Sequence, residues 1–259
     1  MRALVIAEIG SCHDRELSKA LALVDAAAAA GADVVKAQFW SSADRLADRR
    51  RVPDEYRQIY RLYQMPADWL PVLHERCECH GVEFMCTTYL PEDVAVVAPF
   101  VQRFKISSFE AEAGDLIEAH RPFSHRAIVV SLGMAASRAA VTAVFRRARF
   151  LHCVSAYPAP LDEMQLSVLW SRDYAGLSDH SRQLDMGGLA VAAGAEIIEA
   201  HIRLDDTDPS NPDFATAFSP GEFAEYVANI RRVETIMGDG RKRLMPSEEP
   251  MSAFRVVAP

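Results

Sequence analysis

Two histidines lie at matching positions in the second half of the sequence. His180 ends the stretch GLSDH at 176–180, and His201 ends EAH at 199–201. Each follows a short apolar run of the kind that forms a buried strand. Two imidazoles that converge on one point form a site for a divalent metal, which water and substrate oxygens can complete. We therefore predict a metal site at His180 and His201; the alternative is that each is a hydrogen-bonded core residue.

Lysine is scarce in this chain, and two of its four lysines fall inside apolar runs. The chain has 28 basic residues, and all except these four lysines are arginines. Lys36 follows two valines, and Lys105 lies between Phe104 and Ile106. Because lysine is rarely buried without an anionic partner, the pair predicts a bound phosphate or carboxylate. The alternative is an internal ion pair with Glu8 or Glu110.

Eight apolar runs in the chain each end in polar residues. A single serine after a strand is usually part of a turn, but eight such ends together indicate a site. The residues at these ends are Glu8, Lys36, Gln38, Thr87, Thr88, Lys105, Ser107, Ser108, Glu110, Ser131, Ser155, Tyr157, Ser178, Asp179, His180, Glu199 and His201. Neighbouring residues of a strand point in opposite directions, so Ser178 and His180 share a face and Asp179 turns away. We therefore expect no Ser-His-Asp relay within 178–180.

The apolar runs alternate with segments of helical periodicity. Strands are predicted at residues 4–9, 33–39, 83–88, 103–108, 127–133, 150–155, 174–179 and 196–202. Helices are predicted at 16–31, 68–81, 91–100, 114–120, 137–148, 161–171, 187–194 and 220–238, with a short one after residue 39. Strict alternation predicts an α/β protein with a parallel sheet, and eight units in about 250 residues fit a closed (β/α)8 TIM barrel.

A doubly wound open sheet is the structural alternative. The first strand is not followed by GxGxxG, which argues against a dinucleotide-binding form of that fold. In a barrel, the carboxyl ends of all the strands meet at one mouth, which is where such enzymes hold their reacting groups. The polar strand ends are therefore expected to lie together.

Composition limits the classes of function. Of the 259 residues, 50% are hydrophobic and 25% charged, and the formal net charge is −8. This acidic balance argues against nucleic acid as a partner, because phosphate backbones require broad basic surfaces. The sequence has neither a signal peptide nor an apolar run of about 18 residues, so we expect a cytoplasmic protein with no membrane partner. Its five scattered cysteines, without CxxC, indicate no disulfide framework.

Several motifs resemble those of the sialic acid synthase family, which makes N-acetylneuraminate and related nonulosonates. They are IAEIG at 6–10, GADVVKAQ at 31–38, FKIS at 104–107, SLGM at 131–134, LHCVSAYPAP at 151–160, GLSDH at 176–180, EAH at 199–201 and GDGRKRLMPSEEP at 238–250. They occur in the family's order over nearly the whole chain. The resemblance implies a transferase that condenses phosphoenolpyruvate (PEP) with a sugar aldehyde such as open-chain N-acetylmannosamine. The product would be a 3-deoxy-2-ulosonic acid, with phosphate released.

The resemblance also implies roles for single residues. PEP would be held by Lys36, Thr87, Lys105, Ser108, Ser131, Ser155, Tyr157 and Ser178, with the two lysines among the catalytic groups. Glu8 and Glu110 would be the candidates for proton transfer, and Gln38 and Asp213 would contact the acceptor or the reacting water. His180 and His201 would bind the metal, with Mn²⁺ expected foremost and Mg²⁺ or Co²⁺ as alternatives.

The chain departs from the family on the acceptor side. CHDR at 12–15 stands where NHNG is usual, and residues 49–70 lack an asparagine that many members use on the acceptor amide. Longer members also carry an antifreeze-like domain that crosses a dimer and supplies an arginine. Here we expect a single catalytic barrel over residues 1–240 and a tail over 241–259. The acceptor is expected to be either a sugar like N-acetylmannosamine or a variant of it. A homodimer is expected, and a separate chain that supplies the missing domain is an alternative.

Two other functions remain open at this point. One is an aldolase that forms a Schiff base on Lys105 or Lys36 and uses no metal. The other is a barrel without catalysis that binds a sugar or a partner protein. The presence of both lysines and both histidines favours the PEP-dependent synthase.

Overall fold

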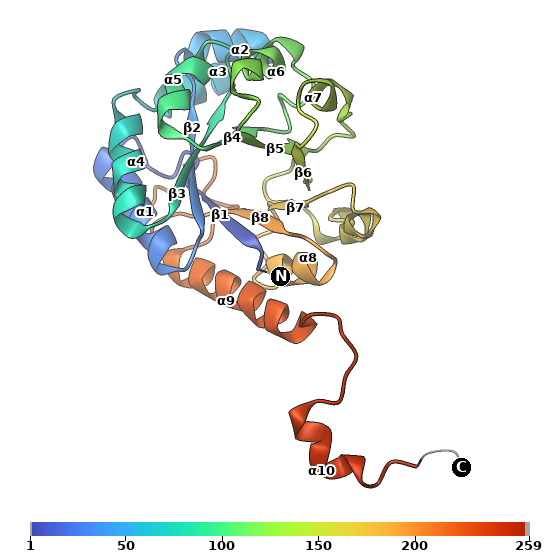
Figure 1. The fold of residues 1–259 in the computed structure, drawn as a ribbon. Coiled ribbons are helices and arrows are strands. Elements are labelled where there is room, and N and C mark those ends of the chain that lie inside the picture. Colours follow the sequence, from blue (N-terminus) through green and yellow to red (C-terminus); the bar gives the residue numbers. More distant parts are fainter. Residues whose placement is uncertain (1, 257–259) are drawn as a thin grey trace.

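Eight parallel strands close into a barrel, with most helices around its outside (Figure 1). The computed structural model describes residues 2–256. The strands are β1 (Leu4–Glu8), β2 (Val34–Phe39), β3 (Glu83–Thr88), β4 (Arg103–Ile106), β5 (Ala127–Leu132), β6 (Arg149–His152), β7 (Gly176–Asp179) and β8 (Ile197–His201). Each strand pairs with the next, and β8 pairs with β1. The predicted (β/α)8 TIM barrel is confirmed, and the open-sheet alternative is wrong.

Helices follow most strands where the periodicity predicts them. They are α1 (Leu17–Ala29), α2 (Ala43–Arg50), α3 (Asp54–Leu62), α4 (Trp69–His80), α5 (Asp93–Val97), α6 (Gly114–Ala119), α7 (Ala139–Val144), α8 (Met186–Ala192), α9 (Pro220–Met237) and α10 (Glu249–Ser252). The helix α9 begins at a capping box in which Ser219 accepts a hydrogen bond from the Glu222 amide and Glu222 accepts one from the Ser219 amide.

One predicted helix, at residues 161–171, is wrong. The structure has two short 3-10 helices there, Leu161–Glu163 and Leu166–Ser171. Gln165 between them has a left-handed backbone with φ of 45°. A left-handed residue cannot continue a right-handed helix, so the apolar spacing of this segment does not produce one.

Apolar side chains fill the barrel interior on the amino-terminal side of the mouth. This buried layer consists of Ile6, Val34, Met85, Val129, Leu151 and Ile197. Inward side chains recur every second residue along a strand, so the next inward positions towards the carboxyl ends include Glu8, Lys36 and Glu199. The layer therefore supports a polar one directly above it, at the barrel mouth.

After α9 the chain leaves the barrel and runs away from it as a tail (Figure 1). The tail contains a short 3-10 helix, Pro246–Glu248, and α10. Its apolar side chains Leu244, Met251 and Phe254 are exposed. The boundary predicted at residue 240 stays a prediction, and residues 257–259 of the predicted tail lie outside the described residues.

The helices of residues 2–256 include none with both the length and the apolar character needed to cross a membrane.

Candidate active site

All the residues to which the resemblance assigns a role lie at the barrel mouth, around two adjoining cavities. The inner cavity, of about 170 Å³, is lined by Glu8, Lys36, Gln38, Thr87, Lys105, Ser108, Ser131, Tyr157, Ser178, His180, His201 and Asp213. Glu110 and Ser155 line the outer cavity, of about 1290 Å³, which also reaches Tyr157 and Asp213. The inner cavity is small for a ligand site and suits a compact molecule, whereas the outer one has room for a sugar.

Glu199 is the centre of a buried charge network, a role that the sequence did not predict. Its Oε2 lies 3.3 Å from Lys36 Nζ, and its Oε1 lies 3.3 Å from Lys105 Nζ. Oε1 also accepts a hydrogen bond of 2.9 Å from Ser178 Oγ. Glu199 faces the same interior as His201 two residues later, which is the signal in the sequence that points to the site.

Each lysine has further partners. Lys36 forms an ion pair with Glu8 and donates a hydrogen bond of 3.1 Å to Thr87 Oγ1. Lys105 donates one of 2.8 Å to Ser131 Oγ. The internal ion pair that was the alternative to a bound anion is thus present between Lys36 and Glu8. Glu110 instead pairs with an arginine.

The two lysines have opposite pKa shifts. Burial opposes the charge of Lys36, but Glu199 and Glu8 outweigh it and raise the pKa of Lys36 to about 12. Burial lowers the pKa of Lys105; Glu199 offsets part of this effect, and the charge of Lys36 adds to it. The carboxylates therefore neutralise the charge of Lys105 less than that of Lys36. A bound anion would be stabilised more beside Lys105 than beside Lys36.

The rings of His180 and His201 lie edge to face, with an interplanar angle of 62° and centroids 5.6 Å apart. Nδ1 of His180 lies 2.7 Å from the carbonyl oxygen of Val154, which can only accept, so Nδ1 carries the proton and Nε2 keeps its lone pair. Burial, together with His201, lowers the pKa of His180 to about 3. The imidazole is therefore neutral at pH 7 and has the form that binds metals.

His201 complements that arrangement. Its Nδ1 is buried without a hydrogen-bond partner and lies 3.8 Å from Asp213 Oδ1. Across residues 2–256, no group of three or more His, Cys, Asp and Glu side chains is arranged to hold a metal. Two neighbouring imidazoles could bind a divalent ion only if water or substrate oxygens supplied the other ligands. The metal site at His180 and His201 stays a prediction.

Asp179 points away from the mouth, as expected from strand alternation. Its Oδ2 accepts a hydrogen bond of 2.8 Å from the hydroxyl of Tyr226 in α9, and its Oδ1 accepts one of 2.8 Å from the Ser181 amide. These bonds attach the end of β7 to α9. The stretch GLSDH therefore contains no Ser-His-Asp relay, and Asp179 supports the position of its neighbours.

Asp213 reaches the mouth because the loop after β1 leaves room for it. Its Oδ2 accepts hydrogen bonds from the amide of Ser11 at 2.8 Å and from its hydroxyl at 2.7 Å. Gly10 has φ of +47°, and a Cβ on it would lie 2.3 Å from Asp213 Oδ2. Glycine is required there both for the backbone and for the approach of the carboxylate.

Arg50, at the end of α2, is a second site residue that the sequence did not predict. Its Nε and Nη2 donate to the two oxygens of Glu110 at 2.8 and 3.0 Å, and Nη1 donates to the Tyr60 hydroxyl at 3.0 Å. The guanidinium lies 5.0 Å from the ring centroid of Tyr89 and 4.8 Å from that of Phe109. Arg50 lines both cavities, so it stands at their border.

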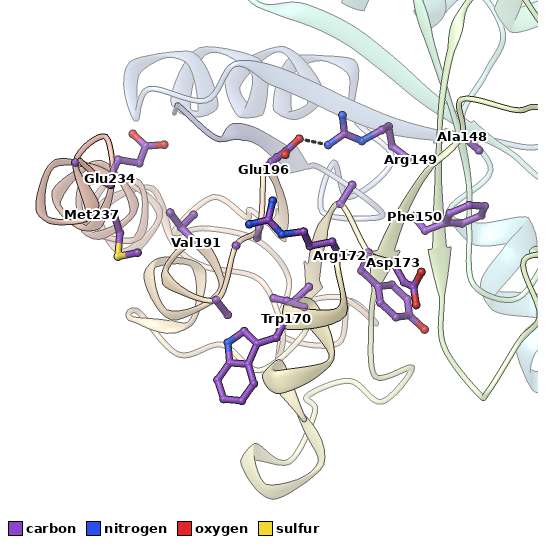
Figure 2. Close-up of a pocket in the computed structure, with 18 residues that line it drawn as sticks. Ala148, Arg149, Phe150, Trp170, Arg172, Asp173, Val191, Glu196, Glu234 and Met237 are labelled. Atoms are coloured by element: carbon purple, nitrogen blue, oxygen red, sulfur yellow. Dashed lines mark hydrogen bonds and ion pairs between the residues drawn. The ribbon is translucent and has the colours of Figure 1, made fainter. Parts of the chain in front are cut away.

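A third cavity, of about 690 Å³, lies beside the amino ends of β6 and β8, and Figure 2 shows the residues that line it. Its wall includes the ion pair of Arg149 and Glu196 and the exposed side chain of Trp170. Arg149 begins β6 and Glu196 precedes β8, so this is the amino end of the strands, where barrels carry stability rather than catalysis. None of the predicted site residues lines it.

Comparisons with known proteins agree with this geometry. The model of the NeuB family matches residues 23–242. The spore coat polysaccharide biosynthesis protein SpsE of Bacillus subtilis is 33% identical, over 91% of this chain and 69% of that protein. A pseudaminic acid synthase of Campylobacter jejuni is 29% identical, over 93% and 76%. The crystal structure of an N-acetylneuraminic acid synthetase from Leptospira borgpetersenii superposes with a TM-score of 0.89 at 27% identity, over 98% and 92%.

Proposed function

The chain belongs to the NeuB family, and from this premise we propose that it is a metal-dependent synthase that condenses PEP with a sugar aldehyde and releases phosphate. The observation that carries the proposal is the inner cavity, where two buried lysines, several hydroxyl groups and two imidazoles face one another. Two of the matched proteins are named as synthases of pseudaminic acid and of N-acetylneuraminic acid. The product here would accordingly be a 3-deoxy-2-ulosonic acid.

The inner cavity suits the charges of PEP. Lys36 and Lys105 would bind its phosphate and carboxylate, and the hydroxyls of Thr87, Ser131 and Ser178 already contact these lysines or Glu199. Donors fixed before the reaction stabilise charge without reorganising during it. The hydroxyls of Ser108 and Ser155, 2.8 Å apart, and that of Tyr157 complete the proposed PEP site towards the outer cavity.

The proposed reaction forms one C–C bond and breaks one C–O bond. The methylene carbon of PEP bonds to the aldehyde carbon, and the aldehyde oxygen takes up a proton to become a hydroxyl. Water adds to the second carbon of PEP, which forms a new C–O bond, and one of its protons is released. The hydroxyl so formed then loses its proton to the departing phosphate, as the bond from that carbon to the phosphate oxygen breaks and the carbon becomes a ketone. A divalent ion bound by His180 and His201 would polarise the aldehyde oxygen. We expect Mn²⁺, with Mg²⁺ or Co²⁺ as alternatives.

Two carboxylates are the proposed groups for the proton transfers. Glu8 lines the inner cavity, where its pairing with Lys36 holds it beside the proposed PEP site. Glu110 lies at the outer cavity, where Arg50 and Ser107 hold it. Gln38 and Asp213 line the inner cavity and are the proposed contacts to the acceptor or the reacting water. Either glutamate can exchange a proton with water or with the acceptor.

We further propose a cytoplasmic homodimer with one catalytic barrel over residues 1–240 in each chain. A separate chain that supplies an additional domain remains the alternative. Size-exclusion chromatography with light scattering gives the mass of the assembly and distinguishes a dimer from a monomer.

A phosphate-release assay with PEP, Mn²⁺ and a panel of aldoses tests the proposed reaction. Turnover with at least one aldose is the expected result. The absence of turnover with every acceptor, together with no binding of PEP in a calorimetric titration, contradicts it.

The lowered pKa of Lys105 favours one competing function, a Schiff-base aldolase, because a neutral amine is the nucleophile. Borohydride reduction in the presence of pyruvate separates the two. A synthase that uses PEP gives no labelled lysine, whereas an aldolase gives a stable adduct on Lys105 or Lys36 that mass spectrometry detects.

A further inference from the structure

The outer cavity is where the second substrate of the proposed reaction must bind. It borders the inner cavity at Arg50, Phe109, Tyr157 and Asp213, which line both. The inner cavity has about 170 Å³ and the outer about 1290 Å³. With PEP in the inner cavity, an aldose has room only in the outer one, with its aldehyde directed towards this border.

The two arginines that line the outer cavity are already in ion pairs. Arg50 donates two hydrogen bonds to Glu110, of 2.8 and 3.0 Å. Arg49 donates to Asp115 with Nη1 2.7 Å from Oδ2, and its Nη2 contacts the other oxygen. A bidentate pair of this kind satisfies the charge of the guanidinium. Neither arginine is available to neutralise a phosphate without losing its carboxylate.

Carboxylates outnumber cations on the walls of this cavity. Four carboxylates, of Glu55, Glu110, Glu112 and Asp213, face two guanidinium groups. Among the described residues, no lysine or arginine forms an ion pair with Glu55, Glu112 or Asp213; Asp213 has only His201 at 3.8 Å. A phosphate dianion placed here would meet like charge in a concave site, which weakens its binding.

The cavity offers other contacts that suit a neutral sugar. Phe109 and Tyr157 are half-exposed at the border, so part of each aromatic side chain is open to a ligand. Arg50 donates one hydrogen from each of its three nitrogens to Glu110 or Tyr60. Its two remaining N–H groups can donate to a carbonyl such as that of an amide. The unpaired carboxylates can accept hydrogen bonds from hydroxyl or ammonium groups.

We propose that the outer cavity selects an aldose that carries hydroxyl, amide or amino groups and no phosphate. This inference rests on the proposed function. It assigns the selectivity to the paired state of Arg49 and Arg50 and to the carboxylates of Glu55 and Glu112, with which no lysine or arginine of the described residues forms an ion pair. The acceptor is therefore uncharged or positively charged.

Matched pairs of acceptors test the inference. N-acetylmannosamine is compared with its 6-phosphate, and D-arabinose with its 5-phosphate, at saturating PEP and Mn²⁺ in low and high salt. We expect kcat/KM to be lower for the phosphorylated member by roughly tenfold or more at low salt, with a smaller difference at high salt because salt screens the repulsion. An equal or higher value for the phosphorylated member overturns the inference.

Binding to the PEP-loaded enzyme separates this inference from the proposed function. If PEP binds but no pair is turned over, calorimetric titration of each sugar is the deciding measurement. Binding of only the unphosphorylated members supports the inference. Binding of both members alike, or of neither member of any pair, overturns it. Failure of the proposed function is distinct, because PEP itself would then neither bind nor release phosphate.

A charge-removal variant tests the cause. In Glu55→Gln combined with Glu112→Gln, discrimination against the phosphorylated member should decrease by roughly three- to tenfold, because two negative charges are removed. Glu225→Gln is the matched control, since this exposed glutamate of α9 does not line the cavity. If discrimination is the same in the double variant and in Glu225→Gln, the charge of the walls does not determine the selectivity.

Discussion

The inner and outer cavities share a border, yet they are built from different parts of the chain. The inner cavity is formed mainly by side chains at the ends of strands, whose positions the register of the barrel determines. The outer cavity is formed largely by α2, α3 and the loops after the strands. The difference teaches that the barrel places the lysines, hydroxyls and imidazoles of the proposed PEP and metal site, whereas the connections form the cavity proposed for the acceptor.

Electrostatics separate the two regions in the same way. In the inner cavity Lys105 remains incompletely neutralised, because burial lowers its pKa and Glu199 is shared with Lys36. In the outer cavity each lining arginine has a carboxylate of its own. The inner cavity is thus suited to an anion and the outer one to a neutral or cationic molecule. Substitutions that act on one cavity and spare the other test this division.

The largest effect is expected for Lys105→Met. PEP affinity should fall by about 100- to 1000-fold, because a buried, hydrogen-bonded cation is lost from an anion site. Calorimetric titration with PEP measures it. The exposed lysine of the tail gives the matched control Lys242→Met, which should bind PEP like the wild type. Unchanged PEP affinity in Lys105→Met would place the anion elsewhere and remove the distinction between the cavities.

His180→Ala should weaken metal binding by about 100-fold, because one of two imidazoles is lost and the other ligands are exchangeable. Titration with Mn²⁺, monitored by calorimetry or by the electron paramagnetic resonance signal of the free ion, measures the affinity for the metal. His125→Ala removes an exposed histidine and should titrate like the wild type. If His180→Ala shows the wild-type curve, the two imidazoles do not form the metal site.

The inner cavity was predictable from sequence because its residues obey the alternation of strands. Lys36 and Lys105 are conspicuous within apolar runs, and the motifs around them resemble those of a known family. Glu199 shares the inward face of His201, but its partners depend on which side chains meet across the barrel interior. The closed barrel determines which side chains meet Glu199, and the sequence of a single strand does not show it.

The outer cavity was less predictable, for a physical reason. Arg50 sits in a polar connection in which arginine is the common basic residue, so no pattern marks it. Its role depends on how α2 folds over the mouth and meets Glu110. The helix predicted at 161–171 was wrong for a similar reason, because apolar spacing gives no sign of the left-handed backbone of Gln165.

Arg50→Lys should affect the outer cavity selectively. Lysine keeps the positive charge beside Glu110 but loses the planar fork and the stacking on Tyr89 and Phe109. We expect KM for the acceptor to rise by roughly tenfold and the dissociation constant of PEP to change by less than about threefold. Arg121→Lys, at an exposed ion pair, is the control. Equal weakening of PEP and acceptor would show that Arg50 belongs to both sites.

The smallest expected effect is a pH dependence that belongs to the inner cavity alone. PEP binding favours the protonated form of Lys105, whose pKa in the free enzyme lies below the usual value of lysine. The affinity for PEP therefore has its full value below that pKa. It decreases as the pH rises through the pKa, by up to about tenfold per pH unit. Lys36 does not contribute over this range, because its pKa is raised to about 12.

Calorimetry of PEP binding between pH 7 and about 10 tests this dependence. The affinity for PEP should decline with rising pH in the wild type and in Lys242→Met and should stay constant in Lys105→Met. The same decline in all three proteins would mean that another group titrates, and that Lys105 is not the cation that the bound anion neutralises.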